Sequence, residues 1–229
     1  MMRQLPLDLS MRDRPSFENF WAAENGAALE AARKLAGGRP GPLYLFGPGA
    51  CGKTHLLAAV ARQVQETGGA CAFLSFAHTP SAAWEGLADL PPDCTVCVDD
   101  MDALAGQGEG ERRLFVLFEA LAPARRLVLA GRSNPAGLPV AREDLRTRLA
   151  SGPIVAMRRL SDEAKVQALR HRAGLRGLRL SDAAGAYLLT HGPRDPRALF
   201  ALLEALDRET LADGRQLTVP YLRGILARP

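Results

Sequence analysis

The sequence of 229 residues has no uninterrupted apolar run long enough to cross a membrane. Its first nine residues are too few, and too often interrupted by polar residues, to serve as a secretory signal peptide. Internal repeats, low-complexity segments and a contiguous polybasic arm are also missing. We therefore expect a cytoplasmic protein that has no membrane partner and makes no strong direct contact with DNA.

Cysteine is scarce as well, and its placement excludes a disulfide framework. Cys94 and Cys97 form a C-x-x-C pattern, but this pattern lies inside an apolar, strand-like run. Three steps along a strand separate two side chains by about 10 Å and turn them to opposite faces. That geometry suits neither a disulfide nor a shared metal ion. We expect all four cysteines to be small core or near-core residues: Cys51, Cys71, Cys94 and Cys97.

Hydrophobic residues make up 47% of the chain, which is enough for a packed core, and the length fits one large domain or two small ones.

The formal net charge of +4 is unevenly spread. Residues 1–136 carry 13 basic and 15 acidic side chains, whereas residues 137–229 carry 16 and 10. The basic C-terminal part suits contact with the phosphates of a nucleotide or of DNA, and it equally suits an arginine-rich helical surface in water.

Strand-like and helical patterns alternate through the first two thirds of the chain, which predicts a parallel sheet covered by helices on both faces. After residue 160 only helical patterns remain. We therefore divide the chain into an extended tail (residues 1–16), an α/β nucleotide-binding subdomain (17–158) and a helical subdomain (159–229). The expected strands lie at residues 42–46, 70–76, 95–98, 127–130 and 154–156. The expected helices lie at residues 24–35, 53–67, 81–90, 111–121, 161–174, 181–189 and 196–211, with a last one from 218.

An apolar strand runs into the pattern G-x-x-x-x-G-K-T and then into a helix, which is the context that a phosphate-binding P-loop requires. The glycines let backbone N–H groups close around phosphate oxygens, and the helix turns its positive end toward the same anion. We expect Lys53 to reach the β- and γ-phosphates and the Thr54 hydroxyl to hold Mg²⁺. The nucleotide-binding residues expected here are Gly47, Pro48, Gly49, Ala50, Cys51, Gly52, Lys53, Thr54 and His55.

Two carboxylates follow the strand at residues 95–98. In P-loop ATPases the first acid at such a strand end belongs to the Mg²⁺ shell, which predicts that role for Asp99. Asp100 stands where many ATPases place a glutamate that polarises the attacking water, although an aspartate is one methylene shorter. The other interpretation is a simple polar turn after a strand.

Polar residues also follow the strand at residues 127–130, where an ATPase of this build can detect the γ-phosphate. Ser133 and Asn134 can do so by hydrogen bonding and Arg132 by charge. A polar turn before Pro135 is the alternative, and the sequence does not choose among the three residues.

Arginines stand at two further informative places. Residues 144–149 alone predict a solvated helix, but an arginine there can also project from the surface into the nucleotide of a neighbour and stabilise phosphoryl transfer. In the helix that begins at Pro196, arginines lie at the start, where a cation gains nothing from the helix dipole. A bound phosphate would explain that placement, and we favour Arg197 over Arg194.

These elements in this order resemble the AAA+ family, and within it the bacterial replication initiator DnaA and its short regulatory relative Hda. Residues 16–20 and Asn25 resemble the segment that borders the adenine in DnaA-like proteins, which marks Phe20 and Asn25. Residues 145–149 resemble the arginine-finger box and place the finger at Arg148. Residues 160–173 resemble the first lid helix, and Arg197 matches the lid arginine known as sensor 2. One departure is Arg132–Ser133, where DnaA-like proteins usually carry aspartate.

Two features resemble Hda more than DnaA. The helix-turn-helix domain of DnaA is not found in the sequence, and residues 4–9 resemble the Q-L-x-L-x-L peptide by which Hda docks on the sliding clamp of DNA polymerase III. In an extended peptide the leucines can enter an apolar pocket while Gln4 bonds its rim. Chance leucines in a disordered tail are the alternative. The expected clamp-binding residues are Gln4, Leu5, Leu7 and Leu9.

The resemblance implies an α/β AAA+ P-loop protein with a five-stranded parallel sheet and a C-terminal helical lid. Bound to the β subunit of the clamp, it would hold ADP or ATP with Mg²⁺ and promote hydrolysis of the ATP on DnaA through Arg148, meeting DNA only indirectly. Intrinsic ATPase activity, with Asp100 as a further catalytic residue, would be weak. A dATP ligand and a homodimer stay open. The alternatives are an autonomous, DNA-stimulated ATPase of the helicase-loader type and a P-loop kinase.

Overall fold

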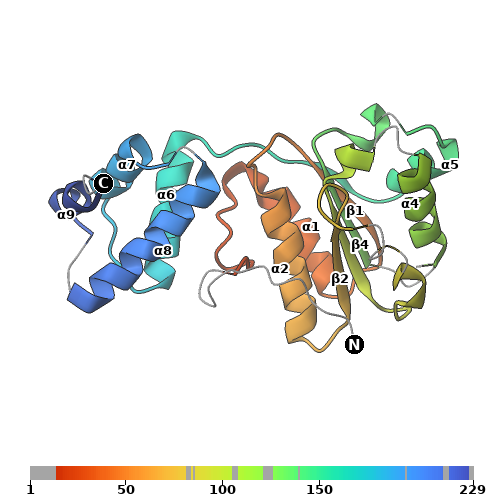
Figure 1. The fold of residues 1–229 in the computed structure, drawn as a ribbon, viewed down its shortest axis with the longest axis horizontal. Coiled ribbons are helices and arrows are strands. Elements are labelled where there is room, and N and C mark those ends of the chain that lie inside the picture. The colour runs from red at the N-terminus through yellow and green to blue at the C-terminus, as the bar shows by residue number, and fades with distance from the viewer. Residues whose placement is uncertain are drawn as a thin grey trace.

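The chain forms an α/β part and a helical part, which lie side by side and are joined by one extended segment near residues 157–161 (Figure 1). This structure is a computed structural model, and it describes residues 14–80, 84, 86–104, 108–120, 126–138, 140–193, 195–213 and 217–226. No helix within these ranges is long and apolar enough to span a bilayer.

The α/β part is built on the predicted parallel sheet of five strands, in the order β2-β3-β4-β1-β5. The registers are regular, with Leu43 of β1 opposite Val128 of β4 and Leu45 opposite Val155 of β5. The P-loop strand β1 therefore lies between β4 and β5, with the strand that ends in Asp99 two places away. The strands are β1 (Gly41–Phe46), β2 (Cys71–Ser75), β3 (Thr95–Asp99), β4 (Arg126–Gly131) and β5 (Ile154–Ala156).

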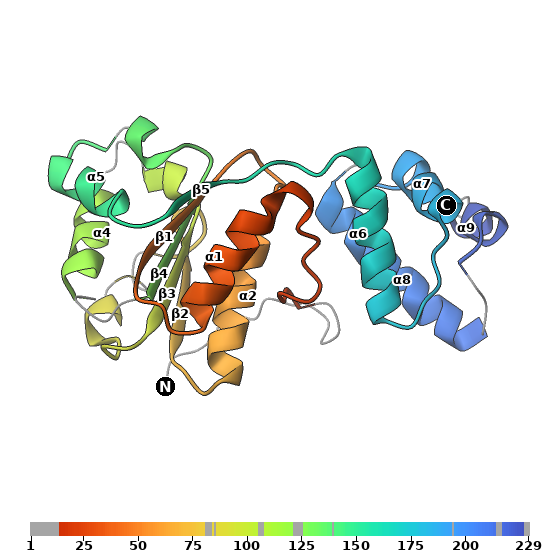
Figure 2. The same ribbon diagram turned by 180° about the vertical axis from the view of Figure 1, so that it is seen from behind.

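Helices cover both faces of the sheet, as the alternating pattern predicts (Figures 1 and 2). One face carries α1 (Gly26–Ala36) and α2 (Lys53–Glu66), and the other carries α4 (Gly108–Ala120) and α5 (Glu143–Leu149). Because β3 lies inside the sheet and is covered on both faces, all five of its residues are buried, and its three central residues, 96–98, are consecutive apolar residues rather than alternating ones. Short 3-10 turns complete this part: η1 (Ala23–Asn25), η2 (Gly86–Asp89), η3 (Met101–Leu104) and η4 (Pro135–Gly137).

Of the helix expected at residues 81–90, the structure describes Trp84, which is helical, and the 3-10 turn η2 that follows it. Gly86 disfavours a helix, and Pro91 and Pro92 end any helical pattern directly after it. The apolar signal instead reflects Trp84, which is buried and stacks on Phe76 with ring centroids 4.3 Å apart.

The two faces of the sheet bury separate hydrophobic clusters, and this separates the C-x-x-C cysteines. Cys94 packs in the cluster under α4 and α5, whereas Cys97 packs in the cluster under α1 and α2. Both are fully buried and all four cysteines are free thiols. The prediction that these two cysteines are core residues on opposite faces of the sheet is confirmed.

The helical part contains α6 (Asp162–Leu175), α7 (Asp182–His191), α8 (Pro196–Asp213) and α9 (Val219–Leu226). Ser161 and Ser181 cap α6 and α7 by accepting hydrogen bonds from the third residue along, each at 3.2 Å. The predicted bundle therefore forms around its own core. The residues at its centre include Leu169, Leu188, Leu199, Leu203 and Leu222.

A nucleotide-binding loop as the candidate functional site

The loop between β1 and α2 has the shape of a phosphate cradle, and two glycines are required for it. A Cβ on Gly47 would collide with the Met157 carbonyl oxygen. Gly52 has a φ of +100°, and a Cβ there would lie 2.8 Å from the Phe20 ring. No other residue type fits these two positions, so the G-x-x-x-x-G spacing reflects real contacts in this fold.

Lys53, the first residue of α2, folds back over the loop. Its ammonium donates to the carbonyl oxygens of Gly47 at 2.7 Å and Pro48 at 3.0 Å. The start of α2 provides free N–H groups and the positive end of the helix dipole at the same place. A cation and a helix N-terminus together favour a phosphate anion in this loop.

Thr54, in the first turn of α2, lies against Asp99, at the end of β3. The Thr54 hydroxyl donates to the Asp99 carboxylate at 2.5 Å. Burial raises the pKa of Asp99 above its ordinary value, while this hydrogen bond and the Asp100 N–H oppose the shift. A hydroxyl and a carboxylate are the oxygen donors that Mg²⁺ prefers, so the pair fits the ion that P-loop proteins use. When bound, the ion would neutralise phosphate charge.

Asp100 is fixed by contacts on both sides of the strand end. Its carboxylate accepts a hydrogen bond from the Ser75 hydroxyl of β2 at 2.6 Å, and its backbone adopts a φ of +57°. These contacts place the side chain at the carboxyl edge of the sheet, beside the Thr54–Asp99 pair. Its role with a water molecule stays a prediction.

The three sensor candidates lie exposed after β4, and a residue that the sequence analysis overlooked fixes them. The Asp102 carboxylate accepts hydrogen bonds from the backbone N–H groups of Arg132 and Ser133. The Asn134 side chain caps η4 by accepting from Ala136 N–H at 3.0 Å. Asn134 is therefore engaged locally, whereas the side chains of Arg132 and Ser133 are turned outward.

Phe20 borders the loop, whereas Asn25 contacts the segment that follows β5. The Phe20 ring packs against Gly52 and lies 5.3 Å from the His55 ring, between centroids. Asn25 is buried, with 2% of its surface exposed, and its amide donates to Arg158 O at 2.9 Å and accepts from Arg158 N–H at 2.8 Å. Asn25 thus fixes the segment that leads to the lid. Contact of either residue with adenine stays a prediction.

His55 connects the loop to the helical part. Its Nε2 lies 2.9 Å from the Ser16 carbonyl oxygen, and its Nδ1 lies 3.2 Å from a guanidinium nitrogen of Arg172 in α6. A neutral ring that donates from Nε2 and accepts at Nδ1 satisfies both contacts. Arg172 also donates to the Asn19 carbonyl oxygen at 3.2 Å, and His171 contacts Glu18 O at 2.6 Å.

This environment predicts an acid-sensitive fold. Burial and the Arg172 charge lower the pKa of His55 to about 4. Between pH 6.5 and 4 the unfolded chain therefore binds a proton that the folded chain does not. The free energy of unfolding then decreases by up to about 1.4 kcal/mol for each unit by which the pH is lowered. We expect wild type to lose about 2 kcal/mol more than His55→Gln between pH 7 and pH 5 in chemical denaturation.

The exposed His191 provides the control for this prediction, because its substitution by glutamine removes a histidine outside this contact. His191→Gln should lose stability with falling pH as steeply as wild type does. Equal slopes for wild type and His55→Gln would contradict the assignment of His55.

The structure separates the two arginines of the R-x-R pattern on α5. Arg146 donates to the Val140 carbonyl oxygen at 2.8 Å and pairs with Glu143 at 2.9 Å, and its side chain is 40% exposed. Arg148 lies at the surface, where its guanidinium pairs with Glu119 and sits over the Phe115 ring, 5.0 Å from the centroid. Its side chain is 38% exposed.

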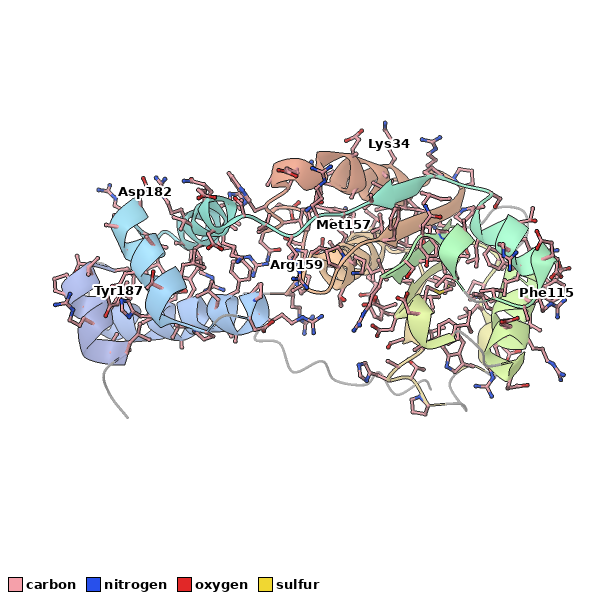
Figure 3. The ribbon with its side chains drawn as sticks, turned by 90° about the horizontal axis from the view of Figure 1, so that it is seen from above. Lys34, Phe115, Met157, Arg159, Asp182 and Tyr187 are labelled. Atoms are coloured by element: carbon pink, nitrogen blue, oxygen red, sulfur yellow. The ribbon has the colours of Figure 1, made fainter. Side chains whose placement is uncertain are left out.

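Phe115 marks the end of the α/β part that is farthest from the lid, whereas Met157 and Arg159 lie where the chain passes from β5 toward α6 (Figure 3). Arg148 therefore belongs to an outer face of the molecule. This position agrees with the prediction of a residue that acts on a neighbour.

The remaining expected sites are the lid arginine and the clamp-binding peptide. Arg197 is exposed in the first turn of α8, and α8 begins at its end nearest the α/β part (Figures 1 and 2). Arg194 lies outside the described residues. The same holds for the expected clamp-binding residues Gln4, Leu5, Leu7 and Leu9.

The comparisons with known proteins agree with this geometry. Residues 162–226 match the family model described as Hda, lid domain. This match covers the helical part and shows a likeness to the Hda lid for these residues. The predicted AAA+ fold, with its lid, is confirmed, and the matched residues correspond to helices α6 to α9.

Solved structures support the same fold. Domain III of DnaA from Thermotoga maritima superposes with a TM-score of 0.71 at 20% identity, over 93% of this chain and 97% of that one. AMPPCP-bound DnaA from Aquifex aeolicus gives a TM-score of 0.67 at 20% identity, over 84% and 64%. The RuvB Holliday junction branch migration motor of Thermotoga maritima gives 0.56 at 18%, over 87% and 65%. The chain thus spans less than two thirds of the longer DnaA chain.

Proposed function

We propose that this Hda-related protein binds ADP or ATP in the loop at residues 47–54, with Mg²⁺ at Thr54 and Asp99. In this state it promotes hydrolysis of the ATP held by DnaA while bound to the sliding clamp. A cradle that requires glycine at positions 47 and 52, a lysine folded over it and an oxygen donor pair beside it support nucleotide binding. The lid match and the DnaA-like fold support a DnaA-related AAA+ regulator.

The observation that carries the proposal is the position of Arg148. The two arginines of α5 are about equally exposed, but Arg146 is held within its own segment by the Val140 carbonyl oxygen and Glu143. Arg148 is instead held at an outer face by Glu119, in a pair that is open to solvent. A phosphate of a neighbouring protein can replace the Glu119 carboxylate, because both groups accept hydrogen bonds from a guanidinium in the same two-pronged manner.

The test measures ATP hydrolysis by DnaA, alone and with the wild-type chain, ADP and DNA-loaded clamp. We expect hydrolysis to accelerate only when all components are present. High turnover by this chain with DNA and without DnaA would favour the second candidate, an autonomous helicase-loader-type ATPase. The specific observation behind that candidate is the Ser75–Asp100 contact next to the Mg²⁺ donors, which resembles a complete hydrolytic site.

Clamp binding is tested separately. Gln4→Ala should abolish retention on immobilised clamp, because the amide at the rim of the pocket is lost, and it should leave ADP affinity unchanged. Gln63→Ala, on the outer part of α2, removes a glutamine away from the peptide and should retain clamp binding. A Gln4→Ala protein that binds clamp as wild type does would refute the docking peptide.

A further inference from the structure

The segment that follows β5 is fixed to the α/β part at two successive residues. Met157 N–H donates to the Phe46 carbonyl oxygen at 2.7 Å. At the next residue the Asn25 amide bonds both backbone groups of Arg158. Arg159 is therefore presented from an anchored backbone, three residues before α6 begins (Figure 3).

From this position Arg159 reaches the phosphate-binding loop itself. Its Nε donates to the Gly49 carbonyl oxygen at 2.9 Å. In a trans peptide the C=O and the following N–H point in opposite directions. A hydrogen bond that holds the Gly49 carbonyl therefore also fixes the direction of the Ala50 N–H, one of the donors with which such a loop surrounds phosphate.

The same peptide is conformationally demanding. Ala50 has a φ of +60°, which a residue with a Cβ adopts only when its surroundings impose it. Gly49 before it has no side chain to restrict the backbone. The guanidinium of Arg159 supplies a restraint from outside the loop.

We propose that Arg159 is a positioning residue for the nucleotide. It keeps the Gly49–Ala50 peptide in the orientation that binds phosphate. Because Arg159 belongs to the connection between β5 and α6, phosphate affinity then depends on where that connection, and with it the lid, is held. This inference rests on the proposed nucleotide binding at residues 47–54.

The neighbouring Arg158 provides a matched control. Its guanidinium carries the same charge one residue away, but it pairs with Glu24 at 3.1 Å and is 77% exposed. Arg158→Ala and Arg159→Ala therefore change net charge equally, and only the second removes the contact with Gly49.

The experiment measures affinity for ADP and for adenosine, which has no phosphate. We expect Arg159→Ala to weaken ADP binding about five- to tenfold, as for a charged hydrogen-bond donor lost at a partly exposed site, and to leave adenosine binding within about twofold. Arg158→Ala should stay within about twofold of wild type for both ligands. Equal ADP affinity of the two variants, or tighter binding by Arg159→Ala, would overturn the inference.

A double-mutant cycle with Ala50→Gly separates positioning from simple charge attraction. Glycine adopts a positive φ without a steric penalty, so the restraint from Arg159 matters less. We expect Arg159→Ala to weaken ADP binding at least threefold less in the Ala50→Gly background. The same loss in both backgrounds would mean that Arg159 acts through charge alone and would overturn the positioning role. A wild-type chain that binds no ADP would instead overturn the proposed function, and this inference with it.

Discussion

Arg148→Ala should fold, bind ADP as wild type does and fail to accelerate ATP hydrolysis by DnaA. Arginine fingers increase phosphoryl-transfer rates by about 10³–10⁵, so the variant is expected to leave DnaA near its unstimulated rate. The fold should tolerate the change, because the pair between Arg148 and Glu119 is exposed and such pairs contribute about 1 kcal/mol or less. The measurement is single-turnover hydrolysis of ATP on DnaA with clamp and DNA present.

Arg142 offers a control on the same surface. Its guanidinium also lies over the Phe115 ring, 4.1 Å from the ring centroid, and it pairs with Asp144. Arg142→Ala therefore removes an equal charge next to Arg148 without removing the finger, and it should retain at least about half of the stimulation. An equal loss in both variants would show that the face works by general electrostatic attraction, and normal stimulation by Arg148→Ala would contradict its assignment.

The surroundings of Arg148 also explain why the effect should depend on a partner. Glu119 and Phe115 hold the guanidinium at the surface in the isolated chain. A phosphate carries more charge than a carboxylate and, inside a composite site, lies in a less polar medium, so it competes well for the same donors. Under the proposed function, Arg148 would therefore leave Glu119 only when a partner's nucleotide is present.

The fold was predictable from local patterns because each strand and helix of the α/β part has its own signal in the sequence. The alternation of patterns predicts a parallel sheet, and the sheet is confirmed. The strand order, in contrast, was not predictable from local patterns. Strand β1 lies between β4 and β5, which are 80 and more residues away in sequence. Pairings of this type depend on how whole layers pack, and no local pattern records them.

The same distinction applies to the candidate site. The P-loop and Asp99 follow from motif spacing, because the chemistry needs glycines, a lysine and an oxygen donor at set positions in the chain. Asp102 has no motif around it, yet its carboxylate organises the loop after β4 from 30 residues away. Arg172 likewise reaches His55 across 117 residues. Contacts between residues so far apart in the sequence can be identified only in the folded structure.

Lys53→Ala should weaken ADP binding by about 30- to 100-fold, the second large effect. The Lys53 ammonium lies on the carbonyl oxygens of Gly47 and Pro48, inside the loop that surrounds phosphate. Removing a charged hydrogen-bond donor from such a site costs about 2–3 kcal/mol of binding free energy. Lys34→Ala is the matched control, because Lys34 stands on the outer side of α1, paired with Glu30 at 3.1 Å (Figure 3). It should bind ADP as wild type does.

Thermal denaturation with and without ADP measures the same loss independently. A ligand at 100 times its dissociation constant stabilises a protein by about 2.7 kcal/mol, whereas at a concentration equal to the dissociation constant it contributes only about 0.4 kcal/mol. At one fixed ADP concentration, wild type and Lys34→Ala should therefore show a large upward shift in Tm, and Lys53→Ala almost none. Without ADP the three proteins should melt close together, because the loop contacts of Lys53 are partly exposed. A full ADP-dependent shift in Lys53→Ala would place the nucleotide outside this loop.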